Sequence, residues 1–413
     1  MFFKKKYKSN KVKTAFLVAV GSELLNFKVN QYSPVFSQKL KEIGIILKGE
    51  ITTPDNLNEI KSAIKYAFNK TDMIIICGGL GPTFDDMTRQ AISEITNKPL
   101  VFSHKIEFFL KSRYNISKLP ENFLNQCYFI KGAKLIENHN GTAFGEILKW
   151  RKKIFIILPG PRREWEEMWE KKIKEFLKKE FNSGNLYTQR FKIADLKEME
   201  VQNLVQDTIN KYKEVNFTVL AGANICEFSI FSYNYLAYKK ARKEIQEKLK
   251  NNIYGYGDET IEENLGKLLA KKKKTISLAE SCTGGLTSSK ITDISGSSAY
   301  YLGSINAYSN DIKHKLLKVN KKTLKKYGAV SKETAIEMAE NAKKIFKSDY
   351  AISITGIAGP GGGTKNKPVG LVYFSVVSDK KIFVEKRFFK GDRKFIKQAS
   401  ANTALWLAYK MLK

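Results

Sequence analysis

Two apolar runs in this chain each end abruptly in a glycine-rich loop, and this arrangement limits the fold more than any other feature. Residues 72–77 lead into Gly-Gly-Leu-Gly, and residues 351–355 lead into a loop with five glycines in nine residues. A continuous apolar run of this length is typical of a strand buried on both faces. Strands that alternate with helices form a parallel sheet, whose ligands bind at the carboxyl ends of the strands. The sequence therefore predicts an α/β fold with candidate sites in these loops.

The N-terminal part is expected to alternate strands and helices. Strands are predicted over 13–20, 45–51, 72–77 and 153–158, and helices over 33–43, 57–68 and 164–176. The loop of residues 78–89 enters a further helix, which ends near residue 95. Its glycines let the backbone approach a ligand closely, and its carboxylates are suited to a divalent cation that bridges a diphosphate. The predicted residues are Gly78, Gly79, Gly81, Thr83, Asp85 and Asp86, the two aspartates being candidate metal ligands. The simpler interpretation is that Asp85 or Thr83 only caps the helix.

The stretch from Thr275 to Gly285 predicts a strand, a tight turn and the start of a helix. Ser281 lies in this turn, where backbone N–H groups of residues 282–285 could hold an oxyanion. The simpler interpretation is an ordinary turn in which a serine or threonine caps the helix. Cys282 is an alternative nucleophile, because a thiolate is stabilised at a helix start.

A lysine general base is predicted further along the chain. Ser309 or Asn310 can cap a helix that reaches Leu317, and this would place Lys313 near the positive end of the helix dipole. A cation is disfavoured there, so the pKa of the lysine is expected to fall. The alternative is a solvated lysine among many. Only three histidines occur, none with a serine and an acid, so a Ser-His-Asp hydrolase is not expected.

The second glycine-rich loop and a nearby arginine are predicted to bind the substrate. Open backbone after a strand suits a phosphate or a ribose, and an arginine at the start of the last helix suits an anion. The residues predicted to bind substrate are Glu280, Cys282, Thr283, Gly284, Gly285, Thr355, Gly356, Gly359, Gly361, Gly362 and Arg393.

The region between these two parts is short and charged. Strand-like runs at 190–193 and 227–233 and helices over 199–212 and 237–249 indicate a small α+β domain without a chemical cluster. We therefore predict three domains, over residues 1–175, 176–256 and 257–413, in which two three-layer α/β domains are joined by the small one.

Composition narrows the functional class. The 413 residues carry a formal charge of +31, but the excess is mostly lysine scattered along the chain, so nucleic acid is not the expected partner. Small phosphorylated nucleotides fit such a chain better. The basic N-terminus precedes an apolar run without a cleavage pattern, and no run is long enough to span a membrane. Four widely spaced cysteines show no zinc or disulfide pattern, so a cytoplasmic enzyme is expected.

Three N-terminal motifs carry a family resemblance. The motifs GGLGPTFDDMTR, NGTA and LPGPRREWEEM, in this order, resemble the N-terminal domain of CinA-like proteins, which is related to the molybdopterin-binding fold. The resemblance implies a metal-dependent ADP-ribose pyrophosphatase. Two motifs depart from the family: residues 26–33 lack its glycine and Asp-Thr-Asn, and Thr53-Pro54-Asp55 replaces Val-Gly-Asp. These departures remove polar groups that a ligand or metal site would use.

Seven C-terminal motifs resemble the CinA C-terminal domain, which also occurs alone as nicotinamide-nucleotide amidase. They are AESCTGG, GSSAYYLG, YSNDIK, GAVS, TGIAGPGGG, KPVG and GDR. The resemblance implies hydrolysis of nicotinamide mononucleotide to nicotinate mononucleotide and ammonia, without a cofactor. It implies Ser281 as nucleophile, Tyr308 and Lys313 in its activation, and a homodimer. Two rivals stay open: a nucleotide- or DNA-binding accessory protein of competence or DNA damage without turnover, and a molybdopterin-handling protein.

Overall fold

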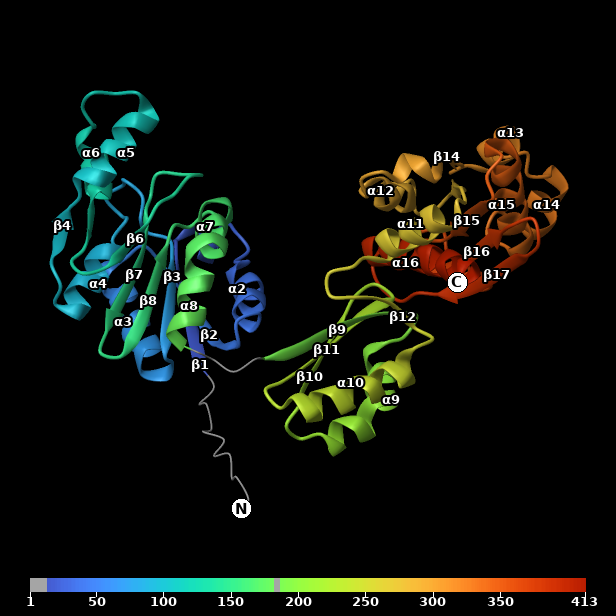
Figure 1. The fold of residues 1–413 in the computed structure, drawn as a ribbon. Helices are drawn as coiled ribbons and strands as arrows, with labels where there is room; N and C mark the ends of the chain where they lie inside the picture. The colour runs from blue at the N-terminus through green and yellow to red at the C-terminus, as the bar shows by residue number, and fades with distance from the viewer. Residues whose placement is uncertain (1–12, 182–185) are drawn as a thin grey trace, which may run out of the picture. The chain divides into compact units, whose positions relative to one another are not determined.

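The computed structural model describes residues 13–181 and 186–413. The chain divides into two compact units, one ending at Leu186 and the other beginning at Tyr187 (Figure 1). The first unit holds a six-stranded sheet, and the second holds a four-stranded and a five-stranded sheet. The α/β class predicted from the sequence is confirmed. The three domain boundaries stay a prediction, since the division by contacts joins the small α+β part to the C-terminal part.

The main sheet of the first unit has the strand order β2-β1-β3-β8-β7-β6. Its strands are β1 (Lys13–Val20), β2 (Ile45–Thr53), β3 (Met73–Cys77), β6 (Lys134–Ile136), β7 (Gly145–Trp150) and β8 (Lys153–Leu158). The first four strands of this order are parallel. β7 runs antiparallel to β8, and β6 runs antiparallel to β7. The ends of β3 and β8 therefore lie at the same edge of the sheet, where the motifs GGLGPTFDDMTR and LPGPRREWEEM begin.

Helices cover both faces of this sheet. Along β1, Leu17 belongs to the core under α2 and α7, whereas Val18 belongs to the core under α3 and α4. Successive side chains of a strand point to opposite faces, so an unbroken apolar run is the pattern of a strand covered on both sides. The helices are α1 (Glu23–Asn26), α2 (Tyr32–Lys41), α3 (Leu57–Lys70), α4 (Thr88–Thr96), α7 (Arg162–Met168) and α8 (Lys174–Phe181). The helix predicted over 164–176 is interrupted by a π-helical turn at Trp169–Ile173.

Residues 100–130 form elements that the sequence analysis did not predict. They are β4 (Leu100–Phe102), α5 (His104–Tyr114), α6 (Glu121–Leu124), a 3₁₀ turn at Asn125–Cys127 and β5 (Tyr128–Ile130), with β4 and β5 paired in a separate two-stranded sheet. Strands of three residues carry too little periodicity to be recognised.

The small α+β part packs two helices on one face of an antiparallel sheet. Its elements are β9 (Tyr187–Ala194), α9 (Glu198–Lys211), β10 (Asn216–Ala221), β11 (Ile225–Ser232), α10 (Tyr235–Leu249) and β12 (Ile253–Tyr256), with the strand order β10-β11-β9-β12. Alternate residues of β11 are buried, as expected for a sheet covered on one side. β10 and β12 were not predicted.

The C-terminal part has the strand order β14-β13-β15-β16-β17, parallel over the first three strands and antiparallel beyond. The strands are β13 (Ile276–Glu280), β14 (Tyr301–Asn306), β15 (Tyr350–Gly356), β16 (Leu371–Val377) and β17 (Ile382–Phe388). The helices are α11 (Ile261–Lys272), α12 (Leu286–Thr292), α13 (Asn310–Lys315), α14 (Lys321–Tyr327), α15 (Lys332–Phe346) and α16 (Arg393–Leu412), with a 3₁₀ turn at Ser297–Ala299. One core lies under α11 and α16 and a second under α15, which makes the predicted three layers.

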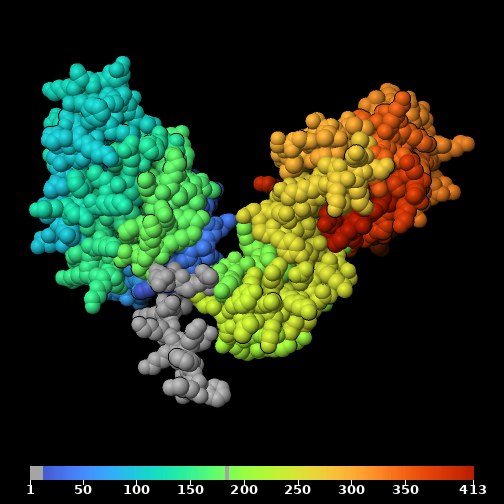
Figure 2. Space-filling view, viewed as in Figure 1, coloured from blue at the N-terminus to red at the C-terminus, as the bar shows by residue number. Residues whose placement is uncertain are grey.

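The two parts of the second unit are joined by polar contacts. The Asn224 amide donates to the Thr403 hydroxyl at 2.8 Å, and the Asn402 amide donates to the Ala223 carbonyl at 2.8 Å. In the space-filling view the yellow-green residues of the small part lie directly against those of the C-terminal part (Figure 2). Among the described residues, no helix is both long and apolar enough to cross a membrane.

Candidate active site

Ser281 follows the last residue of β13 in a tight turn that leads into α12. Its N–H donates to the Ile354 carbonyl of the neighbouring strand at 2.9 Å, so the sheet itself holds the turn. Gly284 and Gly285 then adopt φ of +59° and +89°, a region that favours glycine. The serine is 7% exposed, which leaves its hydroxyl at the end of a rigid strand and close to the surface.

Lys313 reaches Ser281 from a different element. Its Nζ lies 2.9 Å from Ser281 Oγ, 2.7 Å from the Ala307 carbonyl oxygen and 3.2 Å from the Tyr308 carbonyl oxygen. The lysine sits in α13, whose start is capped by the Ser309 hydroxyl accepting from the Ile312 N–H at 3.2 Å. The structure thus brings together the serine and lysine that the sequence placed 32 residues apart.

The environment of Lys313 favours its neutral form. The side chain is 1% exposed, and no described carboxylate forms an ion pair with it. Burial lowers the pKa of Lys313 from 10.5 to about 8. The direction agrees with the sequence prediction, but the main cause is loss of hydration inside the fold and not the helix dipole.

The two carbonyl contacts orient the lone pair of the neutral lysine. A neutral amine has two N–H donors and one lone pair, and the carbonyls of Ala307 and Tyr308 accept those donors. The remaining direction faces the Ser281 hydroxyl, so the amine can accept the serine proton.

Cys282 is not suited to replace Ser281 as nucleophile. The residue is 5% exposed, and burial raises the pKa of its thiol to about 12 even though Lys313 lies near enough to oppose that change. A thiol of this kind is protonated near neutral pH, whereas nucleophilic cysteines are thiolates. Burial of the thiol therefore favours Ser281 over Cys282 as the nucleophile.

Glu280 binds the start of α12. Its buried carboxylate accepts hydrogen bonds from the backbone N–H groups of Gly285 at 3.1 Å, Thr287 at 3.1 Å and Ser288 at 2.8 Å. These backbone donors occupy the carboxylate oxygens of Glu280, so the structure gives it a role in the fold, and its contact with substrate stays a prediction. A helix N-terminus attracts negative charge, and here a side chain of the protein supplies it.

The predicted oxyanion donors are correspondingly fewer. The Gly284 N–H donates to the Ser281 carbonyl at 3.1 Å, and the Gly285 N–H donates to Glu280. Within the described turn this leaves the N–H groups of Cys282 and Thr283, for which no backbone or carboxylate acceptor occurs. The Thr283 hydroxyl is also buried without a hydrogen-bond partner.

Thr355 has a structural role. Its fully buried hydroxyl donates to the Ala329 carbonyl at 2.7 Å, and its contact with substrate stays a prediction. The loop that follows contains Gly356, Gly359, Gly361 and Gly362, of which Gly361 and Gly362 are exposed. The backbone of that loop, and not the threonine, is available to a ligand.

Arg393 and Tyr308 connect the glycine loop to the lysine. The guanidinium of Arg393 donates to the Gly359 carbonyl at 2.7 Å and to the Tyr308 hydroxyl at 2.8 Å. Tyr308 is 64% exposed, and it contacts Lys313 through its carbonyl and not through its ring. The arginine lies where an anionic group bound over the loop would meet it.

The Ala307 carbonyl was not predicted as part of the site. It accepts from the Lys313 amine at 2.7 Å. Because every residue has a backbone carbonyl, no sequence signal distinguishes this one. Only the meeting of β14, α13 and the serine turn gives it a role.

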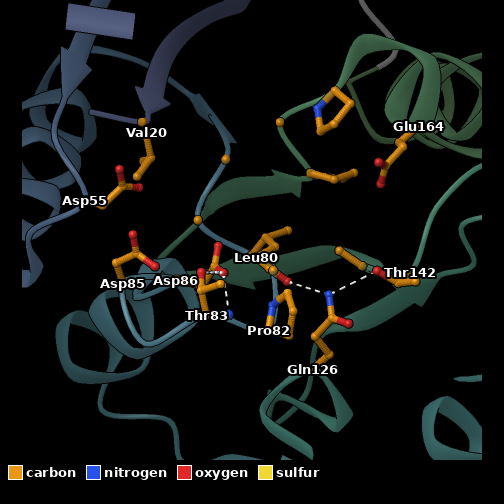
Figure 3. A pocket seen from close by; sticks show the side chains of 18 of the residues that line it. Val20, Asp55, Leu80, Pro82, Thr83, Asp85, Asp86, Gln126, Thr142 and Glu164 are labelled. Carbon is orange, nitrogen blue, oxygen red and sulfur yellow. Dashed lines mark hydrogen bonds between the residues drawn. The ribbon is translucent and has the colours of Figure 1, made fainter. Parts of the chain in front are cut away.

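The first unit contains a separate pocket of about 360 Å³ at the carboxyl edge of its sheet (Figure 3). The loops after β3 and β8 and the loop before β7 meet there, as the three N-terminal motifs predict. The carboxylates that line it are Glu23, Asp55, Asp85, Asp86 and Glu164, and no basic side chain does so. In a chain of charge +31 this is a local excess of negative charge.

Several of these carboxylates already hold the pocket together. Asp86 accepts from the Thr83 N–H at 2.9 Å and from the Thr83 hydroxyl at 2.5 Å, within the loop that precedes α4 (Figure 3). No side chain caps the start of α4, so the simpler interpretation, in which Asp85 or Thr83 only caps this helix, is wrong. Asp55 accepts from the Ser22 N–H at 2.7 Å. Gly78, Gly79 and Gly81 line the same pocket.

A buried ion pair holds the loop that carries Leu80, one of the residues that line this pocket. Arg89 lies 2.7 Å from Glu146, and its guanidinium also donates to the carbonyls of Leu80 and Phe144 at 3.3 and 3.1 Å. No role was predicted for Arg89 or Glu146 from the sequence.

A divalent cation fits the pocket only with help from a ligand. Among the described residues no three histidine, cysteine or carboxylate side chains converge on one point. Magnesium is commonly bound by one or two carboxylates together with substrate phosphates, and Asp85, which forms no hydrogen bond in the described structure, is placed for this.

Comparison with known proteins gives the family. Residues 16–179 match the probable molybdopterin binding domain, and residues 258–412 match the CinA C-terminal domain. A CinA-like protein of Thermosipho melanesiensis is 40% identical over 97% of this chain and 100% of that protein. The chain belongs to the CinA-like family.

Other relatives agree with this assignment. A CinA-like protein of Endomicrobium trichonymphae is 38% identical over 96% of this chain and 98% of its own length. The solved structure of the competence/damage inducible protein CihA from Agrobacterium tumefaciens is 35% identical, with a TM-score of 0.36, and covers 38% of this chain and 98% of that one. The two family models and the full-length relatives confirm the family predicted from the motifs.

Proposed function

We propose that this CinA-like chain hydrolyses the amide of nicotinamide mononucleotide, giving nicotinate mononucleotide and ammonia. The observation that carries the proposal is the 2.9 Å contact between the Lys313 amine and the Ser281 hydroxyl inside a buried, histidine-free corner. A serine with a lysine base can perform acyl transfer without a metal or cofactor.

The residues divide the reaction as follows. Neutral Lys313 takes the Ser281 proton while Oγ attacks the amide carbon, and the carbonyl oxygen becomes an oxyanion near the N–H groups of Cys282 and Thr283. Lys313 returns the proton to nitrogen, the C–N bond breaks and ammonia leaves. Water then attacks the acyl-serine ester, with Lys313 as base, and releases the carboxylate. Backbone donors aimed at the oxyanion typically contribute a large part of the rate.

Arg393 and the exposed glycine loop are suited to the 5′-phosphate of this substrate. The guanidinium can form two parallel hydrogen bonds with a phosphate, which a neutral tyrosine hydroxyl cannot match. We expect the phosphate to take the place that the Tyr308 hydroxyl holds in the structure.

The test is ammonia release from nicotinamide mononucleotide by the full-length protein. Ser281→Ala should reduce kcat by at least about a thousandfold, whereas Cys282→Ser should keep most of the activity, since the thiol is not the nucleophile. Activity that survives in Ser281→Ala and disappears in Cys282→Ser would overturn the assignment. Salt-sensitive DNA binding without any turnover would instead favour the accessory-protein rival.

We propose a second activity, metal-dependent cleavage of ADP-ribose, for the pocket of the first unit. The supporting observation is the concentration of carboxylates with no basic group, since a diphosphate would be repelled there unless a cation accompanied it. A bound divalent cation would neutralise the diphosphate, with Asp85 as the protein ligand. Asp85→Asn should abolish AMP formation. The control is Glu59→Gln, because Glu59 lies on the exposed face of α3. AMP formation unchanged in Asp85→Asn would refute the role of Asp85.

From the family resemblance we also propose that the protein is a homodimer in the cytoplasm. Light scattering of the purified full-length chain would measure its mass directly.

A further inference from the structure

A second pocket in the Tyr187–Lys413 unit lies away from Ser281, between the small α+β part and the C-terminal part. Its volume is about 440 Å³, within the range of small-ligand sites. Residues from β9–α9 and the β10–β11 turn form one wall, and the end of β17 with the start of α16 forms the other. Both walls belong to one compact unit and are held together by the Asn224–Thr403 and Asn402–Ala223 hydrogen bonds.

The second wall is aromatic. Phe389, 9% exposed, lies deep in the pocket, while Phe388 and Phe395 keep 50% and 38% of their surface exposed. Exposed phenylalanine surface is unfavourable in water, and a flat ring inserted between such side chains would recover part of that free energy. On the opposite wall, buried Cys226 and exposed Gly222 add a surface without a projecting charge.

The rim of this pocket is positively charged. Lys197 and Lys390 line it from opposite walls, and neither forms an ion pair with a described residue. Glu198 is the one carboxylate in the lining, so one positive charge remains uncompensated. The combination of one aromatic wall and a cationic rim matches a ring that carries one negative group.

We propose that this junction pocket binds a small planar aromatic anion, such as an aromatic carboxylate. The ring would lie against the phenylalanines, and the anionic group would meet the ammonium groups of Lys197 and Lys390. This binding does not depend on the proposed amidase activity.

The wall that carries the phenylalanines continues into the substrate-binding segment. The Phe389 N–H donates to the Gly370 carbonyl at 2.9 Å, and the Gly370 N–H donates to the Ile357 carbonyl of the glycine loop at 2.7 Å. Asp392, the cap of α16, follows two residues after Lys390 and directly precedes Arg393. The occupant should therefore act as an effector that changes substrate affinity through Arg393.

Binding is tested by titrating the full-length protein with benzoate as the probe and measuring the complex by ligand-observed NMR. Benzamide keeps the ring without the charge, and cyclohexanecarboxylate keeps the charge without the flat ring. We expect benzoate to bind at least about fivefold more tightly than either. Equal affinity for the three probes, or no saturable binding of benzoate at millimolar concentrations, would overturn the proposal.

Variants locate the probe. Lys390→Gln and Phe395→Ala should each weaken benzoate binding about fivefold, with Lys380→Gln and Phe383→Ala as controls. Phe383 is as exposed as Phe395, at 38%, and lies outside the pocket. Binding that is lost in Arg393→Gln but kept in Lys390→Gln would place benzoate in the amidase site and refute the junction pocket.

The effector role rests on the proposed amidase and has its own readout. Saturating benzoate should change the KM for nicotinamide mononucleotide at least about twofold without changing kcat, and Lys390→Gln should remove this effect. Benzoate binding with unchanged KM would refute the effector role while leaving the site intact. Absence of ammonia release in the wild type and in every variant would refute the proposed amidase. The benzoate titrations would still test whether the junction pocket binds an aromatic anion.

Discussion

At the scale of single residues, burial of the Lys313 amine affects the stability of the protein and, in the proposed reaction, its activity. A charged ammonium is costly to bury without a carboxylate partner, so the fold favours the neutral amine. The same property that makes the lysine a base at moderate pH therefore lowers the stability of the protein while the lysine is charged.

This property predicts a pH dependence of the amidase. Below pH 8 Lys313 is mostly protonated, so kcat/KM for nicotinamide mononucleotide should rise about tenfold per pH unit and level off above about pH 8. Initial rates of ammonia release between pH 6 and 9.5 would measure the profile. A rate that is independent of pH across this range would contradict the assignment of Lys313 as base.

A second prediction concerns stability. The pKa of Lys313 is lower in the folded than in the unfolded state, so between pH 8 and 10.5 the unfolded state binds more protons and stability rises with pH. The full difference corresponds to about 3 kcal/mol. Lys313→Met lacks this term, so its free energy of unfolding relative to the wild type should be most favourable below pH 8 and should decline toward pH 10.5. Denaturant titrations at both ends would show this, with Lys380→Gln as an exposed control.

At the scale of secondary-structure elements, the turn between β13 and α12 is held by a carboxylate. Glu280 accepts hydrogen bonds from the N–H groups of Gly285, Thr287 and Ser288, and we propose that this cap positions the neighbouring Ser281. A glutamine keeps the size of the side chain but turns an NH₂ group toward backbone donors, which leaves buried N–H groups without an acceptor.

We therefore expect Glu280→Gln to lower the free energy of unfolding by about 1–3 kcal/mol and to reduce kcat more than it changes KM. Glu262→Gln is the matched control. Glu262, in α11, is also buried and forms an ion pair at 2.9 Å with Lys290 of α12, the helix whose start Glu280 binds. Equal effects of the two substitutions on kcat would show that the cap does not position the serine.

At the scale of the whole molecule, the two compact units have separate cores. Units without a common core commonly unfold in separate transitions. Calorimetry of the full chain should resolve two transitions, and Lys313→Met should shift only one. Asp85→Asn should likewise leave ammonia release unchanged. A single cooperative transition shifted by both substitutions would contradict this independence.

Much of this architecture follows from local patterns in the chain. The boundaries of β1 and β8 were predicted to the residue, because a continuous apolar run depends only on neighbours in sequence. The predictions failed for β10, β12 and residues 100–130, where short strands and turns depend on contacts made elsewhere.

By itself, the sequence determined the order of strands and helices, the loops that hold the sites, and the family resemblance. It also indicated a serine and a lysine without a histidine. The tertiary structure decided that Cys282 is buried, which raises the pKa of its thiol, that Glu280 and Thr355 bond to backbone groups of the protein, and that the Ala307 carbonyl contacts the Lys313 amine beside Ser281. The physical reason is that burial and hydrogen-bond partners come from residues far apart in the chain, and these exist only once the layers have packed.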